Sequence, residues 1–179
     1  MSTHAKMKKN TLKLNDLNLV GKFNIDDYLI FGKNKDNIKI LILRKNLINE
    51  ICILPDKIEY LDCSYNNISE LIDLPFELKK LVCAHNKIKN LDYLPYGIEY
   101  LDCSNNNICE LNNLPTSIIE LYCSNNNIIN LDCVPNNIMI IKCSNNYITK
   151  LNNIPKNIKK ITCINNFSNK YLNYVYKTT

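Results

Sequence analysis

The sequence predicts a repeat solenoid with one curved, parallel β-sheet on its concave face, extended or 3₁₀ segments on its convex side and little α-helix. Three observations predict it. The chain of 179 residues repeats itself every 20 residues from Ile38 onward. Apolar and polar residues alternate over a short part of each repeat, as in a half-buried strand. All six prolines occupy one position of the repeat. This position lies in the segment that leads from one strand back to the next, where proline disfavours a helix.

Seven repeats follow one another without an insertion, and we number their positions 1 to 20 on the reference repeat Ile98–Ser117. Position 1 is isoleucine or leucine throughout, and so is position 4. A fixed period of this length is typical of stacked units that bury their apolar faces against one another. The repeats begin at Ile38, Ile58, Leu78, Ile98, Ile118, Ile138 and Ile158.

The strand is predicted around position 4, with positions 4 and 6 pointing inward and positions 3 and 5 outward. Position 6 is leucine in the first repeat and cysteine in the other six. Cysteine is small and often interior, so we expect a buried, reduced cysteine ladder. The ladder consists of Cys63, Cys83, Cys103, Cys123, Cys143 and Cys163.

Other uses of these cysteines are not favoured by their spacing. Disulfides between parallel strands in one register have poor geometry, and the close cysteine pairs of a zinc site are absent from the sequence. We therefore predict no metal. Cys52, Cys109 and Cys133 lie on the returning part of the repeat, where we expect partial exposure.

Position 9 is always asparagine, at the point where the chain leaves the strand. A buried turn needs partners for its backbone groups, and a stacked carboxamide can supply both donors and an acceptor. The structural asparagines of the complete inner repeats are Asn66, Asn86, Asn106, Asn126 and Asn146.

The return runs from position 12 to position 20 and carries Leu-Pro, Val-Pro or Ile-Pro at positions 17 and 18. These nine residues are too few for two turns and a proper helix. Proline lacks an N–H and fixes φ, so we expect an extended return with at most a 3₁₀ turn.

The pattern L-x-x-L-x-C-x-x-N-x-I-x-x-L-x-x-L-P resembles the leucine-rich repeat over about residues 38–166. The 20-residue, Leu-Pro-containing form is similar to the short repeats of bacterial effector proteins. It is also similar to cysteine-bearing repeats of AT-rich genomes and large viruses. The resemblance implies the solenoid fold.

The repeats are expected to form one domain at 38–166, between an N-terminal tail and cap at 1–37 and a C-terminal cap at 167–179. In the N-terminal cap we predict two short strands within Thr11–Phe23, and then a helical turn that Asn24 caps. Caps are needed because the outermost repeats expose a core face and a sheet edge.

Two further features concern these caps. Ile40 and Ile42 occupy positions 3 and 5 of the first repeat, which predicts either a covering layer formed by the N-terminal cap or an exposed partner site. At the other end we predict an aromatic lid over the last repeat. Its apolar residues are Phe167, Tyr171, Leu172, Tyr174, Val175 and Tyr176.

Charge is distributed unevenly along the chain. Residues 1–57 hold 11 basic and 6 acidic residues, residues 58–153 hold 6 and 11, and residues 154–179 hold 5 and none. The acidic middle would repel phosphate, which argues against a nucleic-acid partner.

The sequence predicts a cytoplasmic protein, in the host cytoplasm if the protein is viral. It has no apolar run of membrane-spanning length and no signal-peptide pattern, so we expect no membrane partner. Its nine cysteines suit a reducing compartment.

No combination of residues predicts catalysis, a cofactor or a small-molecule site. The sequence lacks a glycine-rich phosphate loop, and its two histidines lack an evident catalytic partner. An enzyme would need an unrecognised site, most plausibly around Asp62, His85 and Asp102. An open sheet would give such carboxylates little of the enclosure that acid–base work demands.

The concave face is the predicted binding surface, because its outward residues vary while the core does not. Tyrosines beside carboxylates suit a protein partner, possibly a basic one. Two alternatives remain: a solvated face without a ligand, and self-association through Ile119, Met139 and Ile140. The predicted partner-binding residues are Tyr60, Asp62, Lys80, His85, Tyr100, Asp102, Glu120, Tyr122, Ile140 and Lys142.

Overall fold

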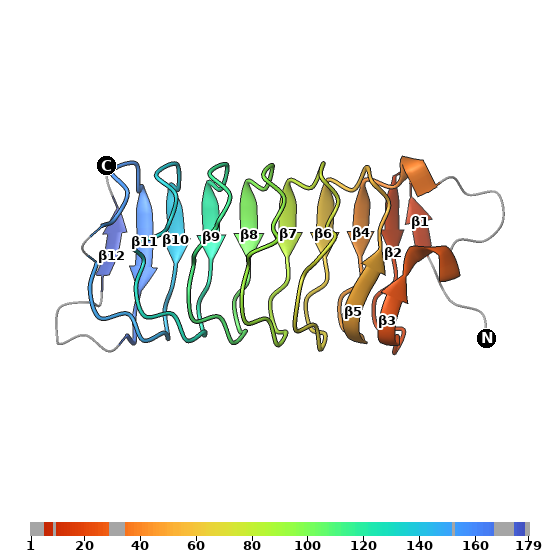
Figure 1. Cartoon of the computed structure of the whole chain (residues 1–179), viewed down its shortest axis with the longest axis horizontal. Coiled ribbons are helices and arrows are strands. Elements are labelled where there is room, and N and C mark those ends of the chain that lie inside the picture. Colours follow the sequence, from red (N-terminus) through yellow and green to blue (C-terminus); the bar gives the residue numbers. More distant parts are fainter. Residues whose placement is uncertain (1–5, 9, 29–34, 152, 167–173, 178–179) are drawn as a thin grey trace.

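The computed structural model is a solenoid in which most strands stand side by side in one row, with strands Lys6–Lys8 and Tyr174–Lys177 at its opposite ends (Figure 1). The structure describes residues 6–8, 10–28, 35–151, 153–166 and 174–177. The described strands are β1 (Lys6–Lys8), β2 (Thr11–Lys13), β3 (Val20–Asn24), β4 (Ile40–Ile42), β5 (Leu47–Ile53), β6 (Tyr60–Asp62), β7 (Lys80–Val82), β8 (Tyr100–Asp102), β9 (Glu120–Tyr122), β10 (Ile140–Lys142), β11 (Lys160–Cys163) and β12 (Tyr174–Lys177).

Ten of these strands form one sheet in the order β1-β2-β4-β6-β7-β8-β9-β10-β11-β12. From β2 to β11 neighbouring strands are parallel. Within the repeats, each residue pairs with the residue 20 positions later, for example Leu81 with Leu101. The predicted parallel sheet and its repeat register are therefore confirmed.

The core lies behind this sheet and consists of the same positions in each repeat. Leucine or isoleucine at position 4 is fully or almost fully buried, from Leu41 to Ile161. The six position-6 cysteines are all 0% exposed. Positions 1, 11 and 14 complete the interior. Each three-residue inner strand thus buries its middle side chain and turns the two flanking ones toward the other face.

The position-9 asparagines bind two neighbouring repeats at once. In Asn106, Nδ2 donates to the carbonyl oxygens of Cys83 and Cys103, each at 3.0 Å. Its Oδ1 accepts from the backbone N–H of Ile88 at 2.9 Å. The same arrangement recurs in the other complete inner repeats. The predicted role of these amides is confirmed.

Position 8 has a left-handed backbone, which the sequence analysis did not foresee. Its φ lies between 55° and 58° in all seven repeats, including Tyr65 and His85. Asparagine tolerates this region better than most residues, which accounts for its presence at position 8 from the fourth repeat onward.

The return is extended and ends in a tight turn at the proline. The N–H of position 1 donates to the carbonyl of that proline, as in Ile118 to Pro115 at 3.2 Å. Proline has no N–H of its own, so its fixed φ suits this site without losing a donor. In the described residues the 3₁₀ helices are η1 (Ile25–Asp27) and η2 (Lys35–Asn37), both before the first repeat.

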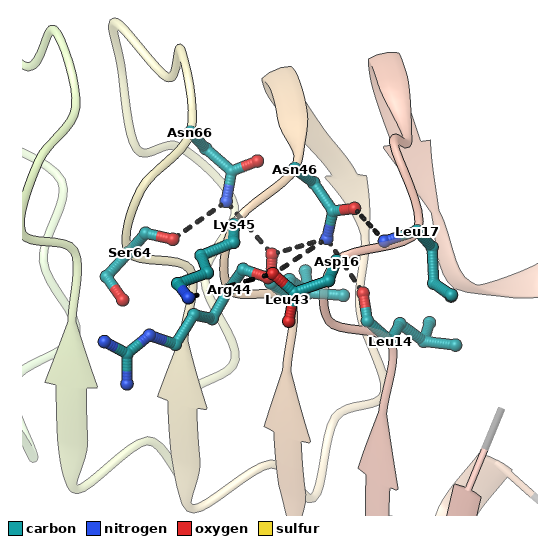
Figure 2. Close-up of polar contacts among 9 residues, drawn as sticks. All are labelled: Leu14, Asp16, Leu17, Leu43, Arg44, Lys45, Asn46, Ser64 and Asn66. Atoms are coloured by element: carbon teal, nitrogen blue, oxygen red, sulfur yellow. Dashed lines mark hydrogen bonds and ion pairs between the residues drawn. The ribbon is translucent and has the colours of Figure 1, made fainter. Parts of the chain in front are cut away.

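The N-terminal region extends the solenoid. Strand β2 pairs in parallel with β4, so that Leu12 matches Leu41, and β3 pairs in parallel with β5 behind the sheet. Asn46 links the first repeat to the segment that precedes it. Its Oδ1 accepts from the backbone N–H of Leu17 at 3.0 Å, and its Nδ2 donates to the backbone carbonyl of Leu14 at 2.8 Å (Figure 2).

Of the two alternatives for Ile40 and Ile42, a covering layer or an exposed partner site, the described part of the cap supports neither fully. The described part of the cap lies beside these residues in the sheet, and both stay half-buried on its face. The physical reason is that an unpaired strand edge has free backbone groups, which β2 satisfies. The predicted cap by Asn24 is confirmed, because its Oδ1 accepts from the N–H of Asp26 at 2.9 Å.

At the other end, β12 pairs antiparallel with β11. The C-terminal segment therefore covers the edge of the last repeat with a strand. Of the predicted aromatic lid, Phe167, Tyr171 and Leu172 lie outside the described residues.

Thiol accessibility tests the burial of the position-6 column. Nine cysteines are unpaired, of which Cys109 and Cys133 are exposed and Cys52 is half-buried, as predicted. Burial raises the pKa of Cys63, Cys83, Cys103 and Cys123, and so opposes the reactive thiolate. We expect iodoacetamide to modify Cys109 and Cys133 first in the native protein, and Cys52 more slowly because burial raises its pKa too. Cys163, whose pKa the hydrogen bond with Cys143 lowers, is protected by its burial alone. All nine cysteines should react in urea, as read from the intact mass. Rapid native modification of a ladder cysteine would contradict this burial.

The asparagine column is tested by Asn106→Ala, with Asn107→Ala as the matched control. Asn106 is 7% exposed and its loss leaves several backbone groups without partners, so we expect a loss of about 1–3 kcal/mol or more. Asn107 is its exposed neighbour, where a change within about 0.5 kcal/mol is expected. Urea denaturation measures both. Equal effects would mean that the amide contacts contribute nothing specific.

Candidate functional site

The concave sheet face carries the side chains at positions 3 and 5, which point away from the core. They come from strands β6 to β11 and are half-buried or exposed, apart from Asp62. These side chains belong to Tyr60, Asp62, Lys80, Val82, Tyr100, Asp102, Glu120, Tyr122, Ile140, Lys142, Lys160 and Thr162.

Four of the predicted residues are in contact across β8, β9 and β10. The rings of Tyr100 and Tyr122 are 5.2 Å apart and tilted by 35°. Lys142 Nζ lies 4.6 Å from the Tyr122 ring centroid, in a cation–π contact. Tyr122 Oη donates to Glu120 Oε2 at 3.0 Å. These contacts hold the side chains in a defined arrangement before any partner binds.

The phenols of this face stay protonated well above neutral pH. Burial, and then the nearby Asp102 carboxylate, raise the pKa of Tyr100 to about 12. Burial also raises the pKa of Tyr122, with a contribution from its hydrogen bond to Glu120, and burial raises the pKa of Tyr60. The phenols of Tyr60 and Tyr100 can therefore donate hydrogen bonds to a partner, whereas the Tyr122 proton is already donated to Glu120.

Asp62 does not fit the expected exposed position. It is only 7% exposed, and its Oδ1 accepts from both the N–H and the Oγ of Ser64, at 3.0 and 2.5 Å. Its strand neighbours are Ile42 and Val82, whose apolar side chains limit solvent around it. The prediction that Asp62 is presented to a partner is wrong.

His85 occupies position 8, on the strand-exit side of its repeat. It lies in the loop after β7, not on a strand, and its exposed ring stacks on Tyr65 with centroids 4.0 Å apart. The Arg44 guanidinium lies 5.3 Å from the other ring of the pair, Tyr65. Tyr65 thus contacts both the His85 ring and the Arg44 guanidinium. The sequence analysis named His85 but missed these contacts.

Asp62, His85 and Asp102, the residues considered for acid–base catalysis, do not form one site. Asp62 and Asp102 lie on β6 and β8, with β7 between them, and His85 is engaged by Tyr65. Among the described residues, no group of three or more metal-binding side chains converges. The described part of the chain also contains no helix that is long and apolar enough to cross a bilayer.

A second group of exposed side chains was missed by the sequence analysis. Phe76, Tyr93 and Tyr96 lie on the return segments and are 79%, 61% and 84% exposed. A signal existed: among the first six repeats, position 19 is aromatic only in the second and third, at Phe76 and Tyr96.

Comparison with solved structures identifies the architecture. YopM from Yersinia enterocolitica has 30% identity and a TM-score of 0.69, over 75% of this chain and 30% of YopM. The leucine-rich repeat domain of a Shigella effector has 24% identity and a TM-score of 0.73, over 90% of this chain and 71% of that domain.

The chain is a leucine-rich repeat protein. A third leucine-rich repeat structure, the functional domain of InlJ from Listeria monocytogenes, includes a cysteine ladder. It has 27% identity and a TM-score of 0.66, over 75% of this chain and 32% of that domain. This chain therefore spans less than a third of both YopM and the InlJ domain. No protein-family model and no curated protein matches the sequence itself.

The raised pKa of Tyr100 predicts a pH dependence of stability. Between pH 10, the ordinary tyrosine value, and pH 12, the folded state keeps a proton that the unfolded state loses. The contribution of this phenol is therefore complete below pH 10 and decreases as pH rises toward 12.

We expect the free energy of unfolding of the wild type to decrease relative to that of Tyr100→Phe as pH rises from 10 toward 12. Urea denaturation of both proteins between pH 9 and pH 11.5 measures it, and pairing the proteins cancels the ionisation of the buried thiols. A difference that stays constant with pH would contradict the assigned environment of Tyr100.

Proposed function

We propose that this leucine-rich repeat protein is a non-catalytic protein-binding module that recognises its partner through the concave sheet face. The observation that supports it most is the Tyr100–Tyr122–Lys142 cluster, which presents aromatic and charged groups on rigid strands. Tyrosine is common among the residues that dominate interface energies.

The contrast between core and surface gives further support. Positions 4 and 9 hardly change from repeat to repeat, whereas positions 3 and 5 combine tyrosine, lysine, carboxylate and aliphatic residues. A constant scaffold with a varied face is the design by which repeat solenoids form extended binding surfaces.

The partner's chemistry follows from the same residues. Residues 58–153 carry 11 acidic and 6 basic residues, which favours a partner with a basic surface and opposes a nucleic acid. Asp102 and Glu120 would attract the basic groups, while the neutral phenol of Tyr100 would donate a hydrogen bond. Lys80, Lys142 and Ile140 would restrict which surfaces fit.

A reducing compartment suits this function. The ladder cysteines are unpaired in the structure, and buried thiols at these positions pack as small apolar residues. We therefore place the protein in the cytoplasm, with the ladder reduced and without a cofactor.

The proposal is tested with a triple variant, Tyr60→Ala, Tyr100→Ala and Tyr122→Ala. Affinity capture from the native cell first identifies partners of the wild type, and calorimetry with the purified partner then measures affinity. We expect the variant to lose at least about 100-fold, since hot-spot truncations cost about 2 kcal/mol or more. The matched control replaces Val20 and Ile129, two exposed apolar side chains outside the ten-stranded sheet, by alanine.

Two results would contradict the proposal. One is equal capture of the same partners by wild type and triple variant, which would remove the concave face from recognition. The other is an equal loss in the control, which would indicate a general surface effect. Circular dichroism of each variant first establishes that the fold is retained.

A self-associating role is the alternative, favoured by one observation. Ile119 is 36% exposed and the N–H of Met139 donates to its carbonyl at 2.8 Å, so the two residues are adjacent. With Ile140 they form a small apolar strip, which a second copy could cover. Light scattering over a range of concentrations separates the two roles, because only self-association makes the mass rise with concentration.

A further inference from the structure

A cavity of about 610 Å³ lies between the return segments of the second and third repeats. Its volume falls within the range of about 300–1,000 Å³ typical of ligand sites. The lining comes from 72–76 and 92–96, which belong to the return and not to strands β6 to β8. The residues that decide its chemistry are Ile72, Asp73, Phe76, Asp92, Tyr93 and Tyr96.

Three aromatic side chains give this cavity its character. Phe76, Tyr93 and Tyr96 are the most exposed large apolar side chains of the second and third repeats. Phe76 and Tyr96, which occupy position 19, depart from the repeat, because the other position-19 residues from the first to the sixth repeat are polar. Those residues are Asp56, Thr116, Asn136 and Lys156. Scaffold packing does not require the rings, since the polar repeats adopt the same fold.

Two carboxylates accompany the rings. Asp73 and Asp92 line the cavity, and no basic side chain lines it among the described residues. Asp92 Oδ1 accepts one hydrogen bond, from Asn113 Nδ2 at 3.2 Å. Neither carboxylate belongs to an ion pair in the described part of the chain. The lining therefore combines two carboxylates with three aromatic side chains.

This combination suits a cation with an apolar stem. The faces of aromatic rings carry partial negative charge and attract ammonium or guanidinium groups, while carboxylates add direct ionic attraction. Lysine and arginine bring methylene groups that pack on Ile72 and the rings. An anionic ligand would be repelled by the two carboxylates. A purely polar ligand would leave the apolar side chains of the lining without a contact.

We propose that this cavity binds a lysine or arginine side chain of a basic peptide segment. The site is separate from the concave sheet face. A second cavity of about 370 Å³, which Asp92 also lines, adjoins it toward the fourth repeat. The peptide residues beside the bound cation can lie across this second cavity, whose lining includes both Glu110 and Lys89 and so suits polar neighbours better than a second cation.

The matched variants come from the repeat itself. Phe76→Asn with Tyr96→Asn installs the residue found at position 19 of the fifth repeat, Asn136. Asp92→Asn removes one carboxylate. Asp132→Asn is its control, since Asp132 holds the same repeat position and accepts the equivalent hydrogen bond from Asn153 at 3.0 Å. The position-16 and position-19 residues near Asp132 are not aromatic.

Fluorescence anisotropy with a fluorescein-labelled Ala-Arg-Ala-Arg-Ala-Arg peptide tests the proposal. The neutral comparison is the same peptide with citrulline for arginine, and its binding should be at least about 10-fold weaker. We expect the double asparagine variant to lose on the order of 10-fold in affinity, in keeping with the loss of two cation–π contacts. Asp92→Asn should weaken binding more than Asp132→Asn does.

Three outcomes would overturn the proposal: no binding of the arginine peptide to the wild type, equal binding of the citrulline peptide, or unchanged affinity in the double asparagine variant. An equal effect of Asp92→Asn and Asp132→Asn would also overturn it, because it would mean attraction by net charge alone. The Tyr60, Tyr100 and Tyr122 triple alanine variant should keep the peptide affinity, so failure here and failure of the concave-face proposal are distinguishable.

Discussion

The carboxamide at position 9 is the interaction on which the rest of the structure depends. Each of these asparagines leaves the strand of its own repeat, donates to a carbonyl in that repeat and to one in the preceding repeat, and accepts from a position-11 N–H of the preceding repeat. Only a side chain with two donors and an acceptor on one planar group can do this. Without it, a tight turn would bury backbone groups that have no partner.

This constraint explains why so much of the sequence is fixed. The amides set the spacing of the repeats, and the strands then pair at a constant register. Leucine at position 4 and cysteine at position 6 fill the narrow space behind them. A larger side chain at position 6 in several neighbouring repeats would crowd its own copies, because stacking brings identical side chains together. Variation is left to the sheet face and to the return.

The period, the core positions and the roles of Asn106 and Cys103 could be predicted from sequence, because each repeats seven or six times and has one physical solution. Asp62 could not, because its burial depends on Ile42 and Val82 in neighbouring strands and on the Ser64 hydroxyl. The N-terminal extension departs from the 20-residue period, so β2 was recognisable as a strand but its partner was not.

The candidate sites, too, could be predicted from the sequence only in part. The positions of Tyr100 and Tyr122 in the repeat placed both on one face. Their contact with each other, and that of Tyr122 with Lys142, depend on side-chain rotamers that the sequence does not specify. Phe76 and Tyr96 were visible as departures from the repeat, but their meaning required the cavity that they share with Asp73 and Asp92. In a repeat protein, the unusual residue at a permissive position is the one to examine.

Amide hydrogen exchange followed by NMR tests the central claim most directly. The position-11 N–H groups of Ile68, Ile88, Ile108 and Ile128 belong to no strand and are held by an asparagine of the following repeat. The account predicts that they exchange as slowly as the amides of the central strands, through global unfolding. Exchange near the unprotected rate at these four sites, with the strands still protected, would contradict it.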